Sequence, residues 1–268
     1  MAFFHLLILS IVQGITEFLP ISSSGHLALV PILTHWQDQG LKLDIATHVG
    51  SLFAVLIYFR SDIFFMLKSL LGRGSAKEVI FGRQLFFHMV IGSIPVVLAG
   101  AAIYFILGTD FRSLLMIAVM TLFFGVVLGA ADYYFKGQRK LEDMNSWDAL
   151  FIGVFQIFAL FPGTSRSGVT MAAALFRGLD RRASAHFSML LSIPVIVGAG
   201  AALSAKVMSE ENFEIGHDAL IAAGAAFVVA YLVIKLLMDW INKIGYMPFV
   251  IYRMLLGVFL LWLYFSAA

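Results

Sequence analysis

Long apolar stretches separated by short polar segments dominate this chain. Six of the stretches are long enough to cross a bilayer, because an α-helix of about 20 residues spans the hydrocarbon core. They cover residues 43–59, 85–107, 113–135, 184–205, 219–238 and 246–265. The pattern predicts six full transmembrane helices.

Two further apolar stretches, residues 3–33 and 147–176, carry a polar break near their centres. In each break a proline and several glycine or hydroxyl residues stand where a continuous helix would need ordinary helix formers. We therefore expect each stretch to form two short helices joined by a turn, so that the chain enters and leaves the membrane by the same face. Such a segment is a re-entrant helix hairpin.

Composition places the chain in a membrane, and its basic residues orient it. Hydrophobic residues make up 61% and charged residues 13%, which leaves too little polar surface for a soluble domain of 268 residues. Thirteen of the 18 lysine and arginine residues fall in the connections 60–83, 136–148, 177–182 and 235–243. The positive-inside rule assigns these four connections to the cytoplasm. Lys42, Arg112 and Lys206 fall on the opposite face.

With these sides, the first hairpin enters from outside and the second from the cytoplasm. A shift of 143 residues also aligns Gln13 with Gln156, Phe18 with Phe161, Ser22 with Ser165, Ser24 with Ser167 and Gly25 with Gly168. We therefore predict an all-α polytopic membrane protein with one integral membrane domain over residues 1–268. Its six full transmembrane helices and two re-entrant helix hairpins form two inverted-topology repeats, residues 1–135 and 146–268.

Several classes of site and partner are excluded by residue content. The chain has no cysteine, so it can form neither a disulfide framework nor a thiolate metal site. No run of lysine and arginine is interleaved with aromatic residues, so no nucleic-acid partner is expected. The first apolar stretch lacks a basic segment and a small-residue cleavage site, so we expect it to belong to the mature fold. The lipid bilayer is the partner that the composition implies.

The first break, GITEFLPISSSGH over residues 14–26, combines the elements of an anion site. Gln13 and Glu17 lie four residues apart and so share a helix face. Pro20 ends that helix, and the serine run can cap the next one, which we expect to start near Gly25. The free N–H groups and positive dipole end of that helix favour an anion, which glycine lets approach the backbone. A histidine adds an imidazole in the first turn.

The second break, PGTSRSGVT over residues 162–170, repeats this design with one change. Thr164 or Ser165 can cap the following helix, and Arg166 stands where the first break has Ser23. Arginine offers a planar, permanently charged fork that suits phosphate. Two such helix N-termini that meet in the membrane would form a pocket for a phosphorylated group. The expected substrate-binding residues are Gln13, Ser22, Ser24, Gly25, Gly163, Thr164, Ser165, Ser167 and Thr170.

Structural roles compete with these assignments. Serine and glycine in membrane helices most often serve packing. Scattered histidines near span ends are expected at the membrane interface, and they are His5, His48, His88 and His186. Arg253 lies close enough to a span end to snorkel, whereas Glu17 and Arg166 indicate function because a buried charge in a membrane is costly. Asp44 lies one turn from His48 and can add a second polar layer.

At the two breaks the chain resembles the bacterial undecaprenyl-diphosphate phosphatases linked to bacitracin resistance. That family's signatures match QGITEFLPISSSGH and PGTSRSGVT in order, and the similarity covers essentially the whole chain. The resemblance implies hydrolysis of undecaprenyl diphosphate to undecaprenyl phosphate, which recycles the carrier lipid for peptidoglycan synthesis. It also implies the inverted-repeat fold, in the bacterial inner membrane, with the pocket open to the periplasm. It assigns the nucleophile to Ser23, the essential carboxylate to Glu17, and further catalytic roles to His26 and Arg166.

One position departs from the family's pattern. Many members have glutamate where this chain has Gln13, and an amide can neither ionise nor act as a base. A mechanism with two carboxylates, including a pair that holds a divalent cation such as Mg or Ca, is therefore disfavoured. Glu17 alone is left as a candidate metal ligand. Acid–base work falls on Glu17 and His26, and Asp44 is the nearest spare acid along the chain.

Alternatives stay open at this point. Transporters also use inverted repeats with broken helices, so a transporter or flippase for a polyprenyl phosphate lipid is the competing function. Ser22, Ser24 or His26 could be the nucleophile in place of Ser23, and a homodimer is a further option. Type 2 phosphatidic acid phosphatases share a Ser-Gly-His stretch, but their arginine followed by a His-x-x-x-Asp motif finds no match in this chain.

Overall fold

The computed structural model describes residues 3–34, 36, 40–106, 113–208 and 216–267. Its α-helices are α1 (Phe3–Thr16), α2 (Ser23–Thr34), α3 (Leu41–Tyr58), α4 (Arg60–Leu70), α5 (Ala76–Ile106), α6 (Leu114–Tyr134), α7 (Ser146–Gln156), α8 (Arg166–Phe176), α9 (Arg181–Met208), α10 (His217–Ile244) and α11 (Met247–Ala267). Two short 3₁₀ helices, η1 (Leu141–Asp143) and η2 (Ile157–Leu160), flank α7. No β-strand is found among the described residues, so the predicted all-helical class is confirmed.

Five helices, α5, α6, α9, α10 and α11, are long and apolar enough to cross a membrane. The pair α3 and α4 counts as a sixth span when taken together, although it bends by 70°. The bend falls at Phe59, whose φ of −94° and ψ of 21° end α3. The chain is a multi-pass membrane protein, as predicted. The expected span 43–59 corresponds to α3, but the expected connection 60–83 is mostly helical rather than a loop.

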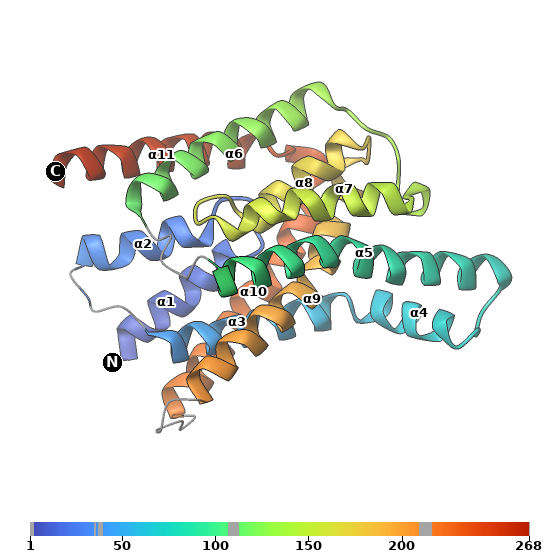
Figure 1. The fold of residues 1–268 in the computed structure, drawn as a ribbon, viewed down its shortest axis with the longest axis horizontal. Helices are drawn as coiled ribbons and strands as arrows, with labels where there is room; N and C mark the ends of the chain where they lie inside the picture. The colour runs from blue at the N-terminus through green and yellow to red at the C-terminus, as the bar shows by residue number, and fades with distance from the viewer. Residues whose placement is uncertain (1–2, 35, 37–39, 107–112, 209–215, 268) are drawn as a thin grey trace.

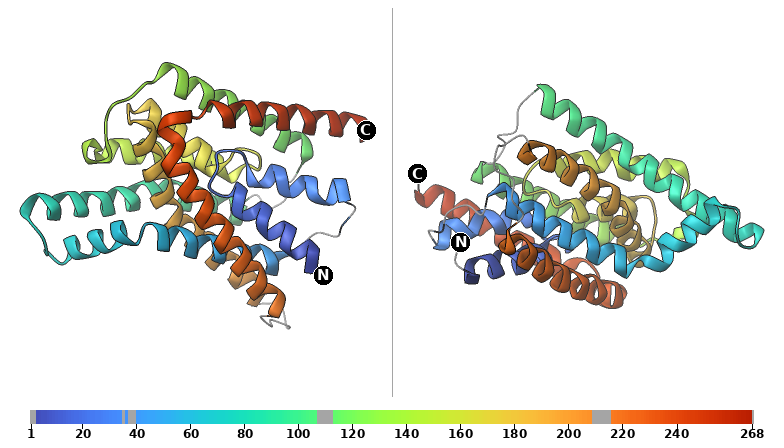
Figure 2. Two further views of the ribbon diagram at one scale, coloured as in Figure 1. Left: turned by 180° about the vertical axis from the view of Figure 1, so that it is seen from behind. Right: turned by 90° about the horizontal axis from the view of Figure 1, so that it is seen from below.

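Small residues let these helices pack closely. α10 packs along α3 and also contacts α1, while α5 packs on α7; Figure 2 shows α10, in orange-red, crossing the molecule beside α1. A Cβ atom added at Gly50 of α3 would overlap the backbone of Ala223 in α10, and one at Gly153 of α7 would overlap Gly92 in α5. Such close approach is typical of membrane helices, which associate through packing because lipid supplies no hydrophobic driving force.

The two broken segments meet near the middle of the molecule (Figure 1). From their common turn, α1 and α2 extend toward the end that holds both chain termini, whereas α7 begins at the opposite end (Figure 1). The α4–α5 and α6–α7 connections also lie at that opposite end (Figure 1). Contacts between the turns are direct. The Ser24 hydroxyl accepts a hydrogen bond from the Gly163 amide at 2.8 Å, and the Ser167 hydroxyl donates to the Leu19 carbonyl at 2.9 Å.

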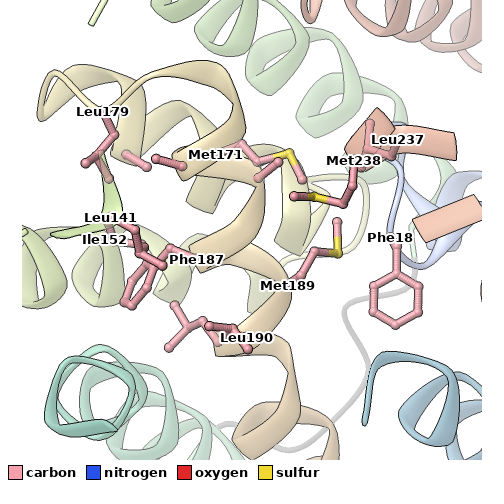
Figure 3. Packing of buried hydrophobic residues seen from close by; sticks show 14 of the residues in the cluster. Phe18, Leu141, Ile152, Met171, Leu179, Phe187, Met189, Leu190, Leu237 and Met238 are labelled. Carbon is pink, nitrogen blue, oxygen red and sulfur yellow. The ribbon is translucent and has the colours of Figure 1, made fainter. Parts of the chain in front are cut away.

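Helix α8 lies inside the main hydrophobic core. All of its residues from 167 to 175 are buried, because the helix is small or apolar on almost every side. Figure 3 shows Met171 of α8 in one cluster with Phe187 and Leu190 of α9 and Met238 of α10. Packing on all faces therefore fixes the helix whose first residue is Arg166.

Basic residues of the predicted cytoplasmic connections are tied to buried carboxylates. Asp148, at the start of α7, pairs with Arg139 and Arg177, each at 2.6 Å. Asp132, near the end of α6, pairs with Arg181 at 2.5 Å. These ion pairs join the ends of α6, α7, α8 and α9, so the basic residues of these connections hold the helix ends together.

Candidate active site

Two serine residues shape the two breaks in the same way. Ser22 has a φ of 76° and Ser165 a φ of 68°, and they are the non-glycine residues with positive φ in the described part of the chain. Each hydroxyl accepts a hydrogen bond from the amide three residues on, Gly25 at 3.3 Å and Gly168 at 3.2 Å. This is N-capping after a left-handed residue. The prediction that Ser165 caps the second helix is confirmed, and α2 begins at Ser23, slightly before the expected start.

A buried arginine holds the turns against α6. Arg253 of α11 is 0% exposed. Its guanidinium donates to the carbonyls of Thr121 in α6, of Pro20 in the first break, and of Gly163 and Thr164 in the second, at 2.9 to 3.4 Å. The prediction that this arginine can snorkel to a span end is therefore wrong. It satisfies main-chain oxygens that the two broken helices leave without helical partners.

A cavity of about 580 Å³ lies where the two breaks meet. Six of the predicted site residues line it: Gln13, Glu17, Ser23, Ser24, Ser165 and Arg166. Asp44 and His48 of α3 line it as well, and apolar residues of α2 and α9 form much of the remaining wall. Cavities of this size with a few convergent polar groups are typical ligand sites.

Glu17 and Arg166 face each other in this cavity. Arg166 Nη2 lies 3.5 Å from Glu17 Oε1, and each side chain is 10% exposed. The guanidinium also donates to the Ser188 carbonyl at 3.2 Å through Nη1 and to the Glu17 carbonyl at 3.4 Å through Nη2. Its buried Nε has no hydrogen-bond partner in the described structure. A buried donor without a partner is costly. The guanidinium also lines the cavity, where its charged fork suits an anion.

The three consecutive serines have different surroundings. The Ser22 hydroxyl caps α2 and lies 3.2 Å from that of Ser24, which in turn accepts from the Gly163 amide. Ser23 lines the cavity, and its hydroxyl makes no hydrogen bond with any described residue. Two of the hydroxyls are therefore engaged in holding the turns together, and the third is available to a ligand.

His48 joins the polar side of the cavity. Its Nδ1 lies 2.7 Å from the Asp44 carbonyl. Its Nε2 lies 3.3 Å from Gln13 Nε2 and 3.8 Å from Glu17 Oε2. Gln13 Nε2 also donates to Glu17 Oε2 at 2.9 Å, so one amide group contacts both the carboxylate and the imidazole.

His26 does not line the cavity. Its Nδ1 lies 2.7 Å from the Ser22 carbonyl, and its Nε2 lies 2.6 Å from the hydroxyl of Tyr252 in α11. The two rings are also stacked, with an interplanar angle of 2°. Both ring nitrogens are therefore engaged on the side of α2 that packs toward α11.

Comparison with known proteins agrees with the motifs. The family model described as bacitracin resistance protein BacA matches residues 6–259. The chain belongs to the BacA family. An undecaprenyl-diphosphatase of Alteromonas mediterranea is 46% identical over 266 residues, which cover 99% of this chain and 100% of that protein. Undecaprenyl-diphosphatases of Hahella chejuensis and Campylobacter curvus are 47% and 44% identical, and the matches cover 98% and 97% of this chain and 99% and 98% of those proteins.

Most of the other predicted site residues of this BacA family member lie in the scaffold of the breaks. Ser22, Gly25, Gly163, Thr164, Ser167 and Thr170 do not line the cavity. Gly163 has a φ of 98°, and a Cβ there would overlap the backbone of Ile117 in α6. The Thr170 hydroxyl lies 2.7 Å from that of Ser188 in α9. These residues determine the shape of the turns, which in turn place Ser23 and Arg166.

The donor set of the cavity does not fit a dedicated divalent cation site. Mg and Ca prefer several oxygen ligands, usually with more than one carboxylate. Among the described residues no group of three or more His, Asp and Glu is arranged so that it could hold a metal ion. Glu17 is the carboxylate that faces Arg166, and the Gln13 amide nitrogen already bonds one of its oxygens. No step of the chemistry below is therefore routed through a metal.

Two cavity residues were only partly recognised from sequence. His48 was expected at the membrane interface, and a second polar layer formed by Asp44 and His48 was the alternative. The structure shows that layer, since both line the cavity. The signal that could have found them is their spacing of one helical turn, which places the Asp44 carbonyl at the His48 ring. Their approach to Glu17 depends on packing between distant helices, which the BacA motifs do not encode.

Proposed function

We propose that this chain hydrolyses undecaprenyl diphosphate to undecaprenyl phosphate and inorganic phosphate. The observation that carries the proposal is the meeting of Ser23 and Arg166 at one cavity, each the first residue of a helix whose N-terminus is capped by serine. The activity named for relatives that match nearly the whole chain supports the substrate. The product is the carrier lipid of peptidoglycan synthesis, which accords with a family linked to bacitracin resistance.

Ser23 is the proposed nucleophile. Its hydroxyl lines the cavity without a partner, whereas the hydroxyls of Ser22 and Ser24 are used by the turns. The Ser23 oxygen forms a bond to the terminal phosphorus, the bridging P–O bond breaks, and undecaprenyl phosphate leaves. Water then hydrolyses the phosphoserine and releases phosphate. A serine is a weak nucleophile unless a neighbouring base takes its proton.

Arg166 and the two helix N-termini supply the electrostatic part of the reaction. Phosphoryl transfer depends mainly on positioning and on stabilising charge on the transferring oxygens. The Arg166 guanidinium and the N–H groups at the starts of α2 and α8 provide donors at the cavity. Glu17 holds the guanidinium in place through Oε1.

The cavity wall also suits a prenyl chain. Leu27 and Pro31 of α2 and Val195 and Ile196 of α9 also line it. An apolar wall in a membrane accepts isoprene units without leaving polar atoms unsatisfied. The headgroup then lies among Ser23, Arg166 and Glu17, while the chain continues along the apolar side.

The membrane arrangement belongs to the same proposal. The segments 3–33 and 147–176 act as re-entrant hairpins of two inverted-topology repeats, and the cavity opens to the periplasm. Support comes from the basic α4–α5 and α6–α7 connections, which lie at the end opposite both termini (Figure 1). The positive-inside rule places that end in the cytoplasm.

The competing transporter or flippase hypothesis gains no support. Anion binding requires donors but no free hydroxyl, and this cavity holds Ser23 beside a carboxylate and a guanidinium. The relatives described above are named as enzymes.

Phosphate release by the purified protein tests the function. The protein in detergent is given a polyprenyl diphosphate, and inorganic phosphate is measured over time. We expect turnover that is lost in Ser23→Ala and a phosphoserine at Ser23 after rapid quench. A well-folded wild-type protein that binds the lipid but releases no phosphate would contradict the proposal and favour transport.

A further inference from the structure

Gln13 and Glu17 cannot share proton transfer as two carboxylates would, because an amide does not ionise. Asp44 of α3 is the other carboxylate in the cavity lining. Both carboxylate oxygens of Glu17 have partners. Glu17 Oε1 pairs with Arg166 at 3.5 Å, and Oε2 accepts a hydrogen bond from Gln13 Nε2 at 2.9 Å. Each oxygen thus helps to hold a neighbouring side chain, which gives Glu17 a positioning role.

The two imidazoles near the breaks differ in what they face. His26 contacts the Ser22 carbonyl and the Tyr252 hydroxyl and lies outside the cavity lining. His48 lies in the lining. Only the second ring is placed where a proton released at the reacting phosphate could reach it.

The hydrogen bonds of His48 select one tautomer. A carbonyl oxygen can only accept, so the contact at 2.7 Å with Asp44 O places the proton on Nδ1. Nε2 then carries a lone pair toward the Gln13 amide at 3.3 Å. The NH₂ group of Gln13 has two hydrogens, and it can direct one to His48 and the other to Glu17. A neutral imidazole fixed through its other nitrogen is the arrangement of a general base.

We propose that His48 is the proton-transfer residue of this cavity, which goes beyond the proposed phosphatase reaction but rests on it. The hydrogen bond from Gln13 to His48 Nε2 breaks, and Nε2 takes the proton of Ser23 as the oxygen attacks, directly or through one water. Undecaprenyl phosphate leaves as an anion. The imidazolium then returns the proton to the Ser23 oxygen as water attacks the phosphoserine. The protons of that water leave with the released phosphate, so each turnover restores neutral His48.

Chemical rescue separates proton transfer from a structural role. We expect His48→Ala to lower turnover by about 10²-fold or more, the usual contribution of a positioned acid or base. Added imidazole should raise the turnover of the His48→Ala protein at least tenfold, because it can occupy the vacated volume in the cavity. The same imidazole should not restore Ser23→Ala. The matched control is His186→Ala, whose ring contacts Asp62 outside the cavity and whose turnover should stay near that of the wild type.

The variant His48→Gln keeps the proposal testable if the alanine variant fails to fold. Glutamine fills the space and can accept from Gln13, but it cannot carry a proton, so turnover should again fall by about 10²-fold. A folded His48→Gln protein that keeps a third of wild-type turnover would overturn the proposal. So would a folded His48→Ala protein that imidazole does not rescue. If the wild type releases no phosphate, the proposed phosphatase function fails instead, which is a different result.

Discussion

The breaks after Thr16 and after Leu160 share one backbone design but differ at one decisive position. In each, a serine with positive φ caps the following helix through its hydroxyl. The next residue is Ser23 in the first break and Arg166 in the second, and both reach the same cavity. A repeated scaffold therefore presents a neutral hydroxyl from one side and a permanent cation from the other. The turn geometry therefore places both side chains at the cavity. The one residue that differs between the breaks determines whether a hydroxyl or a guanidinium is presented there.

The proposed entry of the two breaks from opposite sides of the membrane gives the largest expected contrast, because labelling from one side is all or none. The chain has no cysteine, so single cysteines can be introduced without a background. Cysteines at Ser113 and His217 should react with an impermeant reagent from the periplasm in whole cells. Cysteines at Lys77 and Lys140 should react only after the membrane is opened. Labelling of Ser113 and Lys77 variants from the same side would break the inverted arrangement.

Removing the hydroxyl of the first break tests its assigned chemistry. Ser23→Ala should lower turnover by about 10³-fold or more, because no other free hydroxyl is presented at that helix start. Ser24→Ala loses its hydrogen bond with the Gly163 amide. Its turnover should fall only about tenfold, which corresponds to the free energy of one hydrogen bond. Phosphate release in detergent measures both. A Ser23→Ala protein with most of its turnover would refute the nucleophile assignment and leave the cavity and substrate class in place.

Changing the cation of the second break has a smaller expected effect. Arg166→Lys keeps the charge but loses the planar fork and the free Nε donor, so turnover should fall by about 10²-fold. The matched control is Arg182→Lys on the exposed start of α9, which should leave turnover close to the wild type. Near-normal turnover of the Arg166→Lys protein would show that charge alone, without the fork, is enough.

Local sequence signals predicted much of the site, because short-range features determine where the helices of each break end and begin. Proline and glycine mark both breaks, the serines are suitable caps, and Gln13 lies one helical turn from Glu17. Together with the inverted repeat and the resemblance to the family, these features predicted Gln13, Glu17, Ser23 and Arg166 as site residues, and all four line one cavity.

The remaining features depend on contacts between distant parts of the chain. His26 turns toward Tyr252, a residue 226 positions away, and no pattern around the motif specifies that side of α2. Arg253 reaches carbonyls of both breaks from α11. No proline or glycine beside Phe59 marks the bend in the sequence. Sequence periodicity describes which face of a helix is apolar, but not which partner helix will cover it.

The smallest expected effect concerns the serine caps, and it tests whether the two scaffolds are equivalent. Ser22→Ala and Ser165→Ala each lose the capping hydroxyl while the positive φ remains, so each should lower the free energy of unfolding by about 1 kcal/mol. Ser22→Gly and Ser165→Gly also lose the cap, but glycine adopts positive φ without strain, so they should be close to the wild type. Thermal unfolding in detergent, followed by tryptophan fluorescence, should then show each glycine variant melting above its alanine partner by about 2–4 °C. If this order holds at Ser165 but is reversed at Ser22, the two breaks do not share one energetic design, and the likeness of their backbones does not extend to their stability.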